Sequence, residues 1–387
     1  MENLKLKLET LAVLRGLLSD PVISALSLFF DEPTASNYAE FVSQLYSANG
    51  GNLSEYVREI LSNSENVYVQ RVGAGEQVSD FMSEALAADL SVLQEIADLT
   101  FDTLRSKINY DGFLPAYATN ATDIAAEYLH RAKNIGKYGY GIYAKNGMFY
   151  VDESGVINPV KNPDDTDILD LIDYERERGI IMDNTKALLS GKPAANILLT
   201  GDAGTGKSST VKAVGSALFS EGLRIIEVRK DQLRAIPRIL DELSKNPLKF
   251  VLFIDDLSFL KDDDNYSALK AVLEGSVSAK SKNVVIYATS NRRHIIKEKF
   301  SDREGDDIHR NDTMQELVSL SERFGIHITF NKPDKKTYLH IVRSLAERDG
   351  ITIPASELEA GAERIALERG GRSARLARQY VDSLLAK

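Results

Sequence analysis

Residues 196–209 constrain the fold of this chain more than any other segment. They read NILLTGDAGTGKSS, in which an apolar run leads directly into the pattern G-x-x-x-x-G-K-S. Gly201, Gly204 and Gly206 allow the backbone to turn so tightly that successive N–H groups face one point, at the positive end of the helix that follows. The segment therefore predicts a strand, a P-loop and a helix, which together bind a nucleoside triphosphate. The alternative is a glycine-rich turn that binds nothing.

Two side chains of this loop are expected to take part in the chemistry. Lys207 is expected to reach the β- and γ-phosphates, and Ser208 to place its hydroxyl on the Mg²⁺ that bridges them. The predicted cofactors are therefore ATP, with ADP as its product, and Mg²⁺. The residues predicted to contact the nucleotide are Gly201, Asp202, Ala203, Gly204, Thr205, Gly206, Lys207, Ser208 and Ser209.

The composition indicates an ordinary soluble protein of two or three domains. The chain has 387 residues, 43% of them hydrophobic, and no cysteine, which excludes disulfides, thiolate metal sites and a cysteine nucleophile. The N-terminal leucines are interrupted by Arg15 and followed by Asp20 and Pro21. Neither a signal peptide nor a membrane span is expected, and the predicted location is the cytoplasm. The histidines lack ligand spacing, so no dedicated transition-metal site is expected.

The charge is distributed unevenly along the chain. Lys+Arg and Asp+Glu number 11 and 19 in residues 1–150, 25 and 30 in residues 151–330, and 11 and 8 in residues 331–387. A nucleic-acid module usually carries a basic surface. Nucleic-acid binding is therefore weakly supported, and the C-terminal segment is the better candidate for it.

The hydrophobic pattern divides the chain into four parts. An apolar stripe at helical spacing gives way to an aromatic-rich β-type pattern, then to alternating helices and apolar strands, and finally to a helical pattern. The predicted parts are a mainly helical domain (residues 1–135), a β-hairpin and linker (136–165), a nucleotide-binding α/β core (166–330) and a helical lid (331–387).

Two kinds of strand are expected. Asn146 and Gly147 lie between aromatic residues and predict a hairpin turn in the second part. In the third part, helices alternate with strands that are apolar throughout, which predicts a parallel sheet covered on both faces. The five predicted strands of this sheet are residues 196–200, 224–228, 250–254, 283–290 and 326–330.

Two acids follow one of these strands. Residues 249–256 read KFVLFIDD, the form of a Walker B motif. In P-loop enzymes the first acid, here Asp255, holds Mg²⁺, while the second, here Asp256, polarises the attacking water. The alternative is a pair of acids that cap a helix, because carboxylates are favourable at helix N-termini. The P-loop upstream favours the catalytic interpretation.

Further motifs follow in a fixed order. They are the strand NVVIYATSN at 283–291, SERFG at 321–325 and GGRSAR at 370–375. With the P-loop and the two acids, this order resembles an AAA+ ATPase over about residues 165–387. Within that superfamily, DDLSF at 255–259, ATSNRRH at 288–294, FSDREGDDIH at 300–309 and LSERFG at 320–325 resemble the bacterial domain-of-unknown-function family 815.

The resemblance implies roles for individual residues. Asn291 would be sensor 1, which orients the attacking water, and Arg323 would be the arginine finger that reaches into a neighbouring subunit. Arg375 would be sensor 2 on the lid, and Tyr174 would lie near the adenine. The implied catalytic residues are Lys207, Asp256, Asn291, Arg323 and Arg375. The resemblance also implies a homo-oligomer, with a hexamer as the expected form.

Each arginine has an alternative. Arg323 is also compatible with a surface ion pair, and Arg303 competes with it as the finger. Arg372 and Arg378 lie close enough in the sequence to take the role of Arg375.

Two departures from the superfamily pattern bear on the mechanism. The second acid is Asp256 where Glu is usual, and its shorter side chain predicts slow hydrolysis. Residues 229–234, RKDQLR, occupy the place where threading machines carry an aromatic-hydrophobic-glycine pore loop. The absence of an aromatic residue weakens a threading role.

The leading hypothesis is an oligomeric AAA+ ATPase that binds Mg-ATP and hydrolyses it slowly, in order to remodel or load an unidentified protein or other macromolecular partner. A nucleotide-dependent switch or scaffold with negligible turnover is an alternative. A DNA-associated loader is another, suggested by Arg292, Arg293 and the mildly basic lid. A small-molecule kinase fits the C-terminal helical lid poorly.

Overall fold

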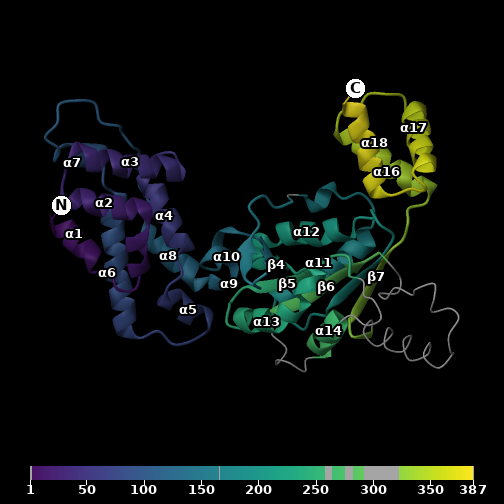
Figure 1. Ribbon diagram of the computed structural model, residues 1–387, viewed down its shortest axis with the longest axis horizontal. Helices are drawn as coiled ribbons and strands as arrows, with labels where there is room; N and C mark the ends of the chain where they lie inside the picture. The colour runs from purple at the N-terminus through teal and green to yellow at the C-terminus, as the bar shows by residue number, and fades with distance from the viewer. Residues whose placement is uncertain (1, 165, 258–263, 275–281, 292–321, 387) are drawn as a thin grey trace. The chain divides into compact units, whose positions relative to one another are not determined.

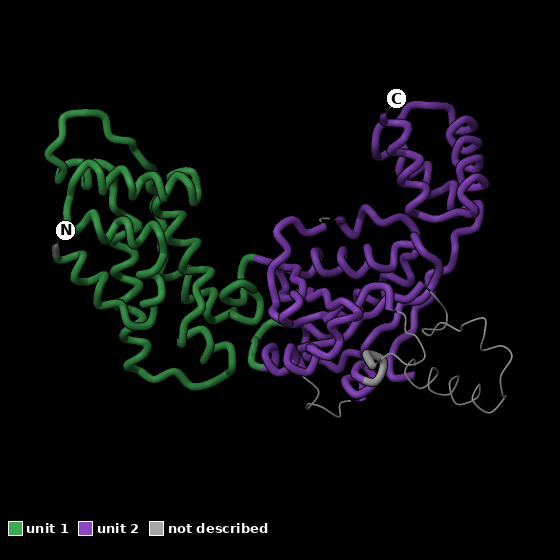
Figure 2. The backbone as a smooth tube through the Cα atoms, in the orientation of Figure 1, with its two compact units in different colours: residues 1–145, 245–248 green, residues 146–244, 249–387 purple. Residues whose placement is uncertain are grey.

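The computed structural model forms two compact units (Figure 2). Unit 1 comprises residues 1–145 and 245–248, and unit 2 comprises residues 146–244 and 249–387. The residues that the structure describes are 2–164, 166–257, 264–274, 282–291 and 322–386.

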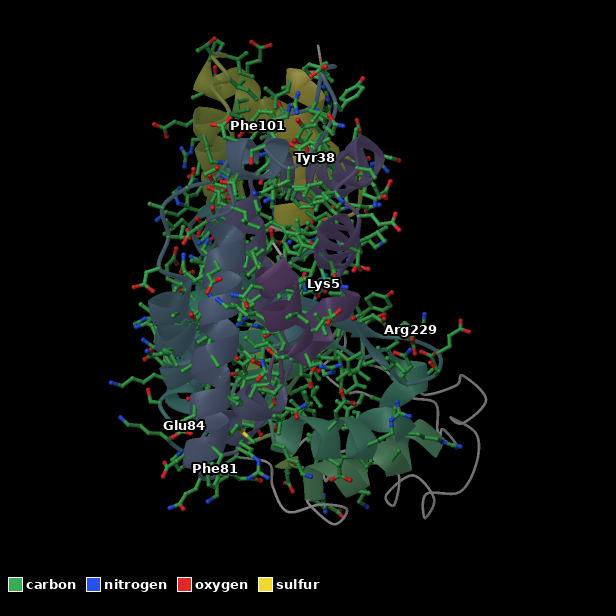
Figure 3. The ribbon with its side chains drawn as sticks, turned by 90° about the vertical axis from the view of Figure 1, so that its left-hand side faces the viewer. Lys5, Tyr38, Phe81, Glu84, Phe101 and Arg229 are labelled. Atoms are coloured by element: carbon green, nitrogen blue, oxygen red, sulfur yellow. The ribbon has the colours of Figure 1, made fainter. Side chains whose placement is uncertain are left out.

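Helices are the regular elements of the described part of unit 1, and irregular segments such as residues 107–123 connect them (Figure 1). Several of its helices begin at a side chain that accepts a backbone N–H, among them Asp20, Thr34 and Asn52. Tyr38, fully buried in its core, packs edge to face on Phe29 and lies beside Phe101 (Figure 3). The helices are α1 (Glu2–Glu9), η1 (Arg15–Ser19), α2 (Pro21–Asp31), α3 (Ala35–Asn49), α4 (Leu53–Asn63), α5 (Val67–Gly73), α6 (Asp80–Ala97), α7 (Phe101–Arg105), α8 (Ile124–Lys133), α9 (Ile135–Tyr138) and α10 (Ile142–Lys145).

The leucine-rich segment near the N-terminus does not form one continuous helix. α1 ends at Glu9, and the backbone N–H groups of residues 12–14 donate to the carboxylate of Asp89 on α6. Asp89 is 4% exposed, so these donors satisfy a buried charge. A distant acid thus interrupts a helix that the apolar spacing alone would have continued.

Unit 2 contains a seven-stranded sheet in the order β2-β1-β4-β5-β6-β3-β7. All neighbouring strands are parallel except the antiparallel pair β1 and β2. The prediction of five strands was wrong, because β1 and β2 extend the sheet beyond β4. The strands are β1 (Met148–Val151), β2 (Ile157–Pro159), β3 (Ile197–Gly201), β4 (Leu223–Glu227), β5 (Lys249–Ile254), β6 (Val284–Ser290) and β7 (Ile326–Phe330).

The hairpin is present, but its turn differs from the predicted one. Asn146 and Gly147 precede β1, and the carbonyl of Gly147 accepts the N–H of Ile225 in β4. The actual turn is residues 152–156, where the Asp152 carboxylate accepts the N–H groups of Ser154 and Val156. An Asp side chain that bonds to the backbone two residues on can replace an Asn-Gly turn. The aromatic-rich residues before the hairpin form the short helices α9 and α10 instead of strands.

Helices cover both faces of the sheet (Figure 1). α11 (Glu175–Leu189) and α12 (Lys207–Ala217) pack on one face, where Ile181, Val211 and Val214 are buried against residues of the central strands. α13 (Ile236–Ser244) contacts β6 and lies with α14 (Asp264–Glu274) on the other face. Short 3₁₀ turns connect these elements: η2 (Ile168–Asp170), η3 (Phe219–Glu221) and η4 (Lys230–Ala235).

The η4 turn is attached to the added hairpin. Gln232, which is 8% exposed, donates from Nε2 to the carbonyls of Val151 (2.8 Å) and Asp152 (3.0 Å). Arg238 donates to the carbonyl of Gly155 in the hairpin turn at 2.6 Å. The segment where threading machines carry a pore loop is therefore held by side-chain contacts to β1 and its turn.

The C-terminal helices form a lid with a hydrophobic core of its own. They are α16 (Lys335–Arg348), α17 (Ala355–Glu368) and α18 (Ala374–Leu385). Tyr338, Ala362 and Ala377, one from each helix, are fully buried together. None of the described helices of either unit combines the length and apolar character that a membrane crossing needs.

Candidate nucleotide site

The loop between β3 and α12 has the backbone that a P-loop requires. Gly201, Gly204 and Gly206 all have positive φ, at 138°, 77° and 93°. A Cβ at Gly201 would lie 2.0 Å from the carbonyl oxygen of Phe330 on β7, so only glycine fits there. The loop ends where α12 begins, at Lys207, so the loop lies at the positive end of that helix.

Lys207 is held at the centre of the loop. Its ammonium donates to the carbonyls of Gly201 (2.9 Å) and Asp202 (2.8 Å) and to Oδ1 of Asn291 (3.0 Å). The residue is 5% exposed, and burial lowers the pKa of its ammonium while the nearby carboxylates of Asp202 and Asp255 oppose that shift. The charged end of Lys207 thus lies between the P-loop and the residue that follows β6.

Ser208 joins the P-loop to the end of β5. Its hydroxyl donates to Oδ1 of Asp255 at 2.6 Å. A second hydroxyl, that of Thr289 on β6, donates to the same oxygen at 2.5 Å. Hydroxyl and carboxylate oxygens are ligands that Mg²⁺ prefers. The predicted metal residues Ser208 and Asp255 are therefore brought together by the fold.

The second acid contacts the predicted sensor. Asp256 has φ 52°, in the left-handed region, and its Oδ1 accepts the side-chain N–H of Asn291 at 2.8 Å. Asn291 in turn accepts from Lys207, so one amide connects the P-loop lysine with the second acid. Three segments that are far apart in the sequence converge here because β3, β5 and β6 are parallel neighbours that end at the same edge.

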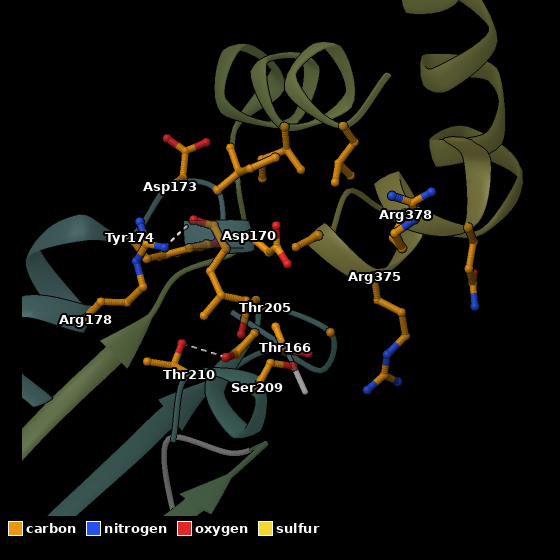
Figure 4. A pocket seen from close by; sticks show the side chains of 18 of the residues that line it. Thr166, Asp170, Asp173, Tyr174, Arg178, Thr205, Ser209, Thr210, Arg375 and Arg378 are labelled. Carbon is orange, nitrogen blue, oxygen red and sulfur yellow. Dashed lines mark hydrogen bonds between the residues drawn. The ribbon is translucent and has the colours of Figure 1, made fainter. Parts of the chain in front are cut away.

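A pocket of about 410 Å³ adjoins the P-loop (Figure 4). It is lined by the segment before α11, by residues 204–206 of the loop and by the lid helices α16 and α18. Tyr174 lines it with its hydroxyl bonded to the carbonyl of Asn331 (2.6 Å) and its ring 5.1 Å from that of Phe330. Burial raises the pKa of Tyr174 to about 12.

The segment at Tyr174 is strained. Tyr174 and Asp173 both have positive φ, near 60°. This conformation is sparsely populated for residues other than glycine. Within the described part of the chain, Oδ2 of Asp173 is buried without a hydrogen-bond partner, and burial raises the pKa of its carboxyl. Neither feature of Asp173 was foreseen from the sequence.

The lid touches the P-loop through the first turn of α18. The backbone N–H of Arg375 donates to the carbonyl of Gly204 at 3.1 Å. Figure 4 shows the Arg375 side chain extending from the lid toward the part of the pocket where Ser209 lies. Among the described residues its guanidinium has no ion-pair partner.

The neighbouring arginines are engaged inside the lid. Arg372 makes two 2.8 Å bonds to the carboxylate of Glu363. Arg378 pairs with Asp349 (2.5 Å) and with Asp382. Of the three candidates that the sequence left open, Arg375 is the one whose charge is available to a ligand of the pocket.

Arg323 lies at the opposite edge of the sheet. It precedes β7, whose first residue Ile326 pairs with the start of β3, while Gly201 pairs with the last residue of β7. Five residues of extended strand span roughly 15 Å, so Arg323 does not reach the P-loop of its own chain. It pairs with Glu274 of α14 at 2.5 Å and lines a second pocket, of about 620 Å³.

Other residues singled out from the sequence lie outside the described part of the chain. They are Arg303, the competing finger, and the basic pair Arg292 and Arg293. The residue that sequence reasoning missed is Thr289. The signal for it was available, because alternate residues of a strand share a face and Thr289 precedes Asn291 by two.

The fold and the site define an AAA+ P-loop ATPase: a parallel sheet with a P-loop after β3, paired acids after β5 and a polar residue after β6, followed by a helical lid. The chain belongs to the family described as protein of unknown function DUF815, whose model matches residues 144–387.

Solved structures with similarity to this chain include a Thermotoga maritima protein described as the RuvB Holliday junction branch migration motor. It has 17% identity and a TM-score of 0.38, over 57% of this chain and 64% of that one. Two variants of the same motor match with 17% and 16% identity, each over 56% of this chain, 62% and 63% of theirs, and a TM-score of 0.38. This chain thus spans less than two thirds of the motors it matches. A search of curated proteins found no match. The assignment rests on the site geometry and on the family match.

Proposed function

We propose that this protein binds Mg-ATP in the pocket beside the P-loop and hydrolyses it slowly at subunit interfaces of a homo-oligomer, in order to remodel or load a macromolecular partner. The observation that carries the proposal is the 2.6 Å bond between Ser208 and Asp255. It brings together the hydroxyl and the carboxylate that P-loop enzymes use for Mg²⁺, from segments 47 residues apart.

The residues present fit the nucleotide. The N–H groups of the loop between Gly201 and Lys207, with the Lys207 ammonium, would hold the phosphates. Ser208 and Asp255 would hold Mg²⁺, and the base would lie beside Tyr174. Arg375 would place its charge near the phosphates. Bound Mg-ATP supplies the electrophilic γ-phosphorus and, through the cation, part of the charge compensation.

Asp256 and Asn291 are the residues proposed to position the attacking water. Their 2.8 Å bond fixes the two side chains relative to each other, and Asn291 is also bonded to Lys207. The carboxylate of Asp256 would accept a proton from the water as it attacks. Because Asp256 is one methylene shorter than the usual Glu, we propose that turnover is slow.

Arg323 is proposed to complete the site of a neighbouring subunit. Its position at the far edge of the sheet excludes action on its own P-loop, and an arginine finger supplied from another subunit contributes on the order of 10³ to 10⁵ in rate. Isolated monomers are therefore expected to be nearly inactive. The attachment of η4 to the hairpin supports remodelling or loading over threading. A pore loop that threads a polypeptide must move, and these bonds hold η4 in place.

A second function, a nucleotide-dependent switch with negligible turnover, is favoured by Asp256 itself. Its left-handed backbone and its bond to Asn291 hold the shorter acid in one arrangement. The DNA-associated alternative depends on Arg292 and Arg293, which lie outside the described residues, and it stays a prediction.

The test is steady-state ATP hydrolysis per protomer over a wide range of protein concentration, with Lys207→Ala as the blank. Turnover that rises steeply with concentration supports shared sites completed by Arg323. Flat turnover at the level of the blank, together with measurable ATP binding, supports the switch. If the wild-type protein and Lys207→Ala bind ATP equally, the nucleotide site is wrongly assigned.

A further inference from the structure

The turn after β5 depends on contacts from β6. Asp256 is one of three described residues other than glycine with positive φ, and the other two lie in the pocket wall. A left-handed Asp persists where surrounding groups hold it in place. Ser208 and Asn291 bond to the two acids of the 255–257 turn, and the Asp256 N–H also approaches Oδ1 of Asp255 at 3.2 Å, but Thr289 is the residue that contacts the turn at each of its three positions.

Thr289 bonds to all three residues of that turn. Its hydroxyl donates to Oδ1 of Asp255 (2.5 Å) and accepts the N–H of Asp256 (3.0 Å). Its backbone carbonyl accepts the N–H of Leu257 (2.7 Å). A hydroxyl can donate once and accept at the same time, and here it does both. The side chain is 2% exposed, so water does not compete for these bonds.

The register of the sheet explains why Thr289 is placed there. Ile254, the last residue of β5, pairs with Ala288 of β6, so Thr289 lies beside Asp255. Asn291, two residues further on, lies on the same face and bonds to Asp256. Thr289 thus bonds to the carboxylate of the first acid, and Asn291 bonds to the carboxylate of the second.

We propose that Thr289 is a positioning residue: its hydroxyl orients the Asp255 carboxylate toward the Ser208 side, where Mg²⁺ would bind, and holds Asp256 in the left-handed conformation that reaches Asn291. This proposal rests on the proposed function for its metal. Partners that orient a metal-binding carboxylate commonly contribute about 10- to 100-fold to metal affinity or activity.

The first measurement needs no nucleotide. Hydrogen exchange is followed in peptides that contain residues 255–257, for the wild type, Thr289→Val and Thr289→Ser. Thr289→Val keeps the shape and removes the hydroxyl, so exchange of the Asp256 N–H should become at least several-fold faster, whereas Thr289→Ser should protect it as the wild type does. Thr185→Val is the matched control, because Thr185 is a buried threonine on α11 whose hydroxyl bonds to Ile181 and Tyr287. It should leave these peptides unchanged.

The second measurement is Mg²⁺ dependence. Binding of a non-hydrolysable ATP analogue is titrated at increasing Mg²⁺ concentration for the same proteins. Thr289→Val should raise the Mg²⁺ concentration for half-maximal effect by about 10- to 100-fold and leave metal-free nucleotide affinity unchanged. In steady-state assays, kcat should fall more than KM rises, and Thr289→Ser should restore both. If Thr289→Val does not fold, Thr289→Ala is measured at lower temperature with the same expectation.

Two results overturn the proposal. One is a Thr289→Val protein with the exchange and Mg²⁺ dependence of the wild type. The other is a Thr289→Ser protein as impaired as Thr289→Val, which would show that the hydroxyl is not the determinant. A wild-type protein that binds no nucleotide at any Mg²⁺ concentration removes the proposed function and the metal role of Thr289 together. The exchange measurement still decides, in that case, whether Thr289 holds the turn.

Discussion

At the scale of residues, the contacts of each side chain decide what it can contribute to the nucleotide site. Lys207, Ser208 and Asp255 stand in patterns whose spacing reflects their contacts: Ser208 bonds to Asp255, and Lys207 bonds to the carbonyl of Gly201 in the P-loop. The lid arginines share one local sequence, so only their partners separate them. Arg372 is committed to Glu363, whereas Arg375 faces the pocket.

This difference predicts the effect of removing each arginine. Arg375→Ala should weaken ATP binding by about tenfold, or about 1.4 kcal/mol, because a charged contact to phosphate is lost. Arg372→Ala is the matched control and should leave ATP affinity within about twofold of the wild type, because its partner lies within the lid. Isothermal titration with ATP measures both. Equal losses for the two variants would contradict the assignment of Arg375.

At the scale of elements, tertiary contacts changed what local patterns predicted. The hairpin expected as a separate region pairs with β4 and extends the sheet by two strands. Asn146 and Gly147 are a strong turn signal, yet Asp152 makes the turn instead. The lid folds around its own core and is further tied by the ion pair of Arg372 and Glu363.

That ion pair makes the stability of the lid depend on pH. The hydrogen bond from Arg372 holds the pKa of Glu363 below its ordinary value. The stabilisation is therefore fully present above the unfolded pKa of about 4.3 and is lost as pH falls through the lower, folded value. Glu363→Gln should lower the free energy of unfolding by about 1 kcal/mol at pH 7. It should also reduce the fall in that free energy between about pH 4.5 and pH 3. Urea unfolding monitored across that range measures it, and identical pH profiles for the two proteins would refute the linkage.

At the scale of the whole molecule, the position of Arg323 is the most consequential finding. It stands at the amino edge of the sheet, and the P-loop at the carboxyl edge. A residue placed there serves nucleotide chemistry only through a second copy of the chain.

A mixing experiment tests this arrangement. Lys207→Ala and Arg323→Ala should each be inactive alone. In an equal mixture, an Arg323→Ala subunit keeps its P-loop and can receive Arg323 from a Lys207→Ala neighbour. About a quarter of the interfaces should then combine an intact P-loop with an intact Arg323, so about a quarter of the wild-type rate should return. Gln232→Ala replaces Arg323→Ala in a control mixture with Lys207→Ala, because Gln232 contacts the hairpin and not the site. No recovery at concentrations where the wild type is active would show that Arg323 is not supplied between subunits.

The sequence by itself determined the class of this protein, because a P-loop, paired acids after an apolar strand and a polar residue after the next are local patterns set by local chemistry. The helical N-terminal part, the five parallel strands that the sequence predicted and the helical C-terminus followed from periodicity for the same reason. Only the tertiary structure decided the two added strands, the interruption of the first helix by Asp89, the choice of Arg375 and the contacts of Thr289. Each of these features depends on a segment that is distant in the sequence and adjacent in the fold. Strand register and ion-pair partners are such long-range contacts, and no local pattern encodes them.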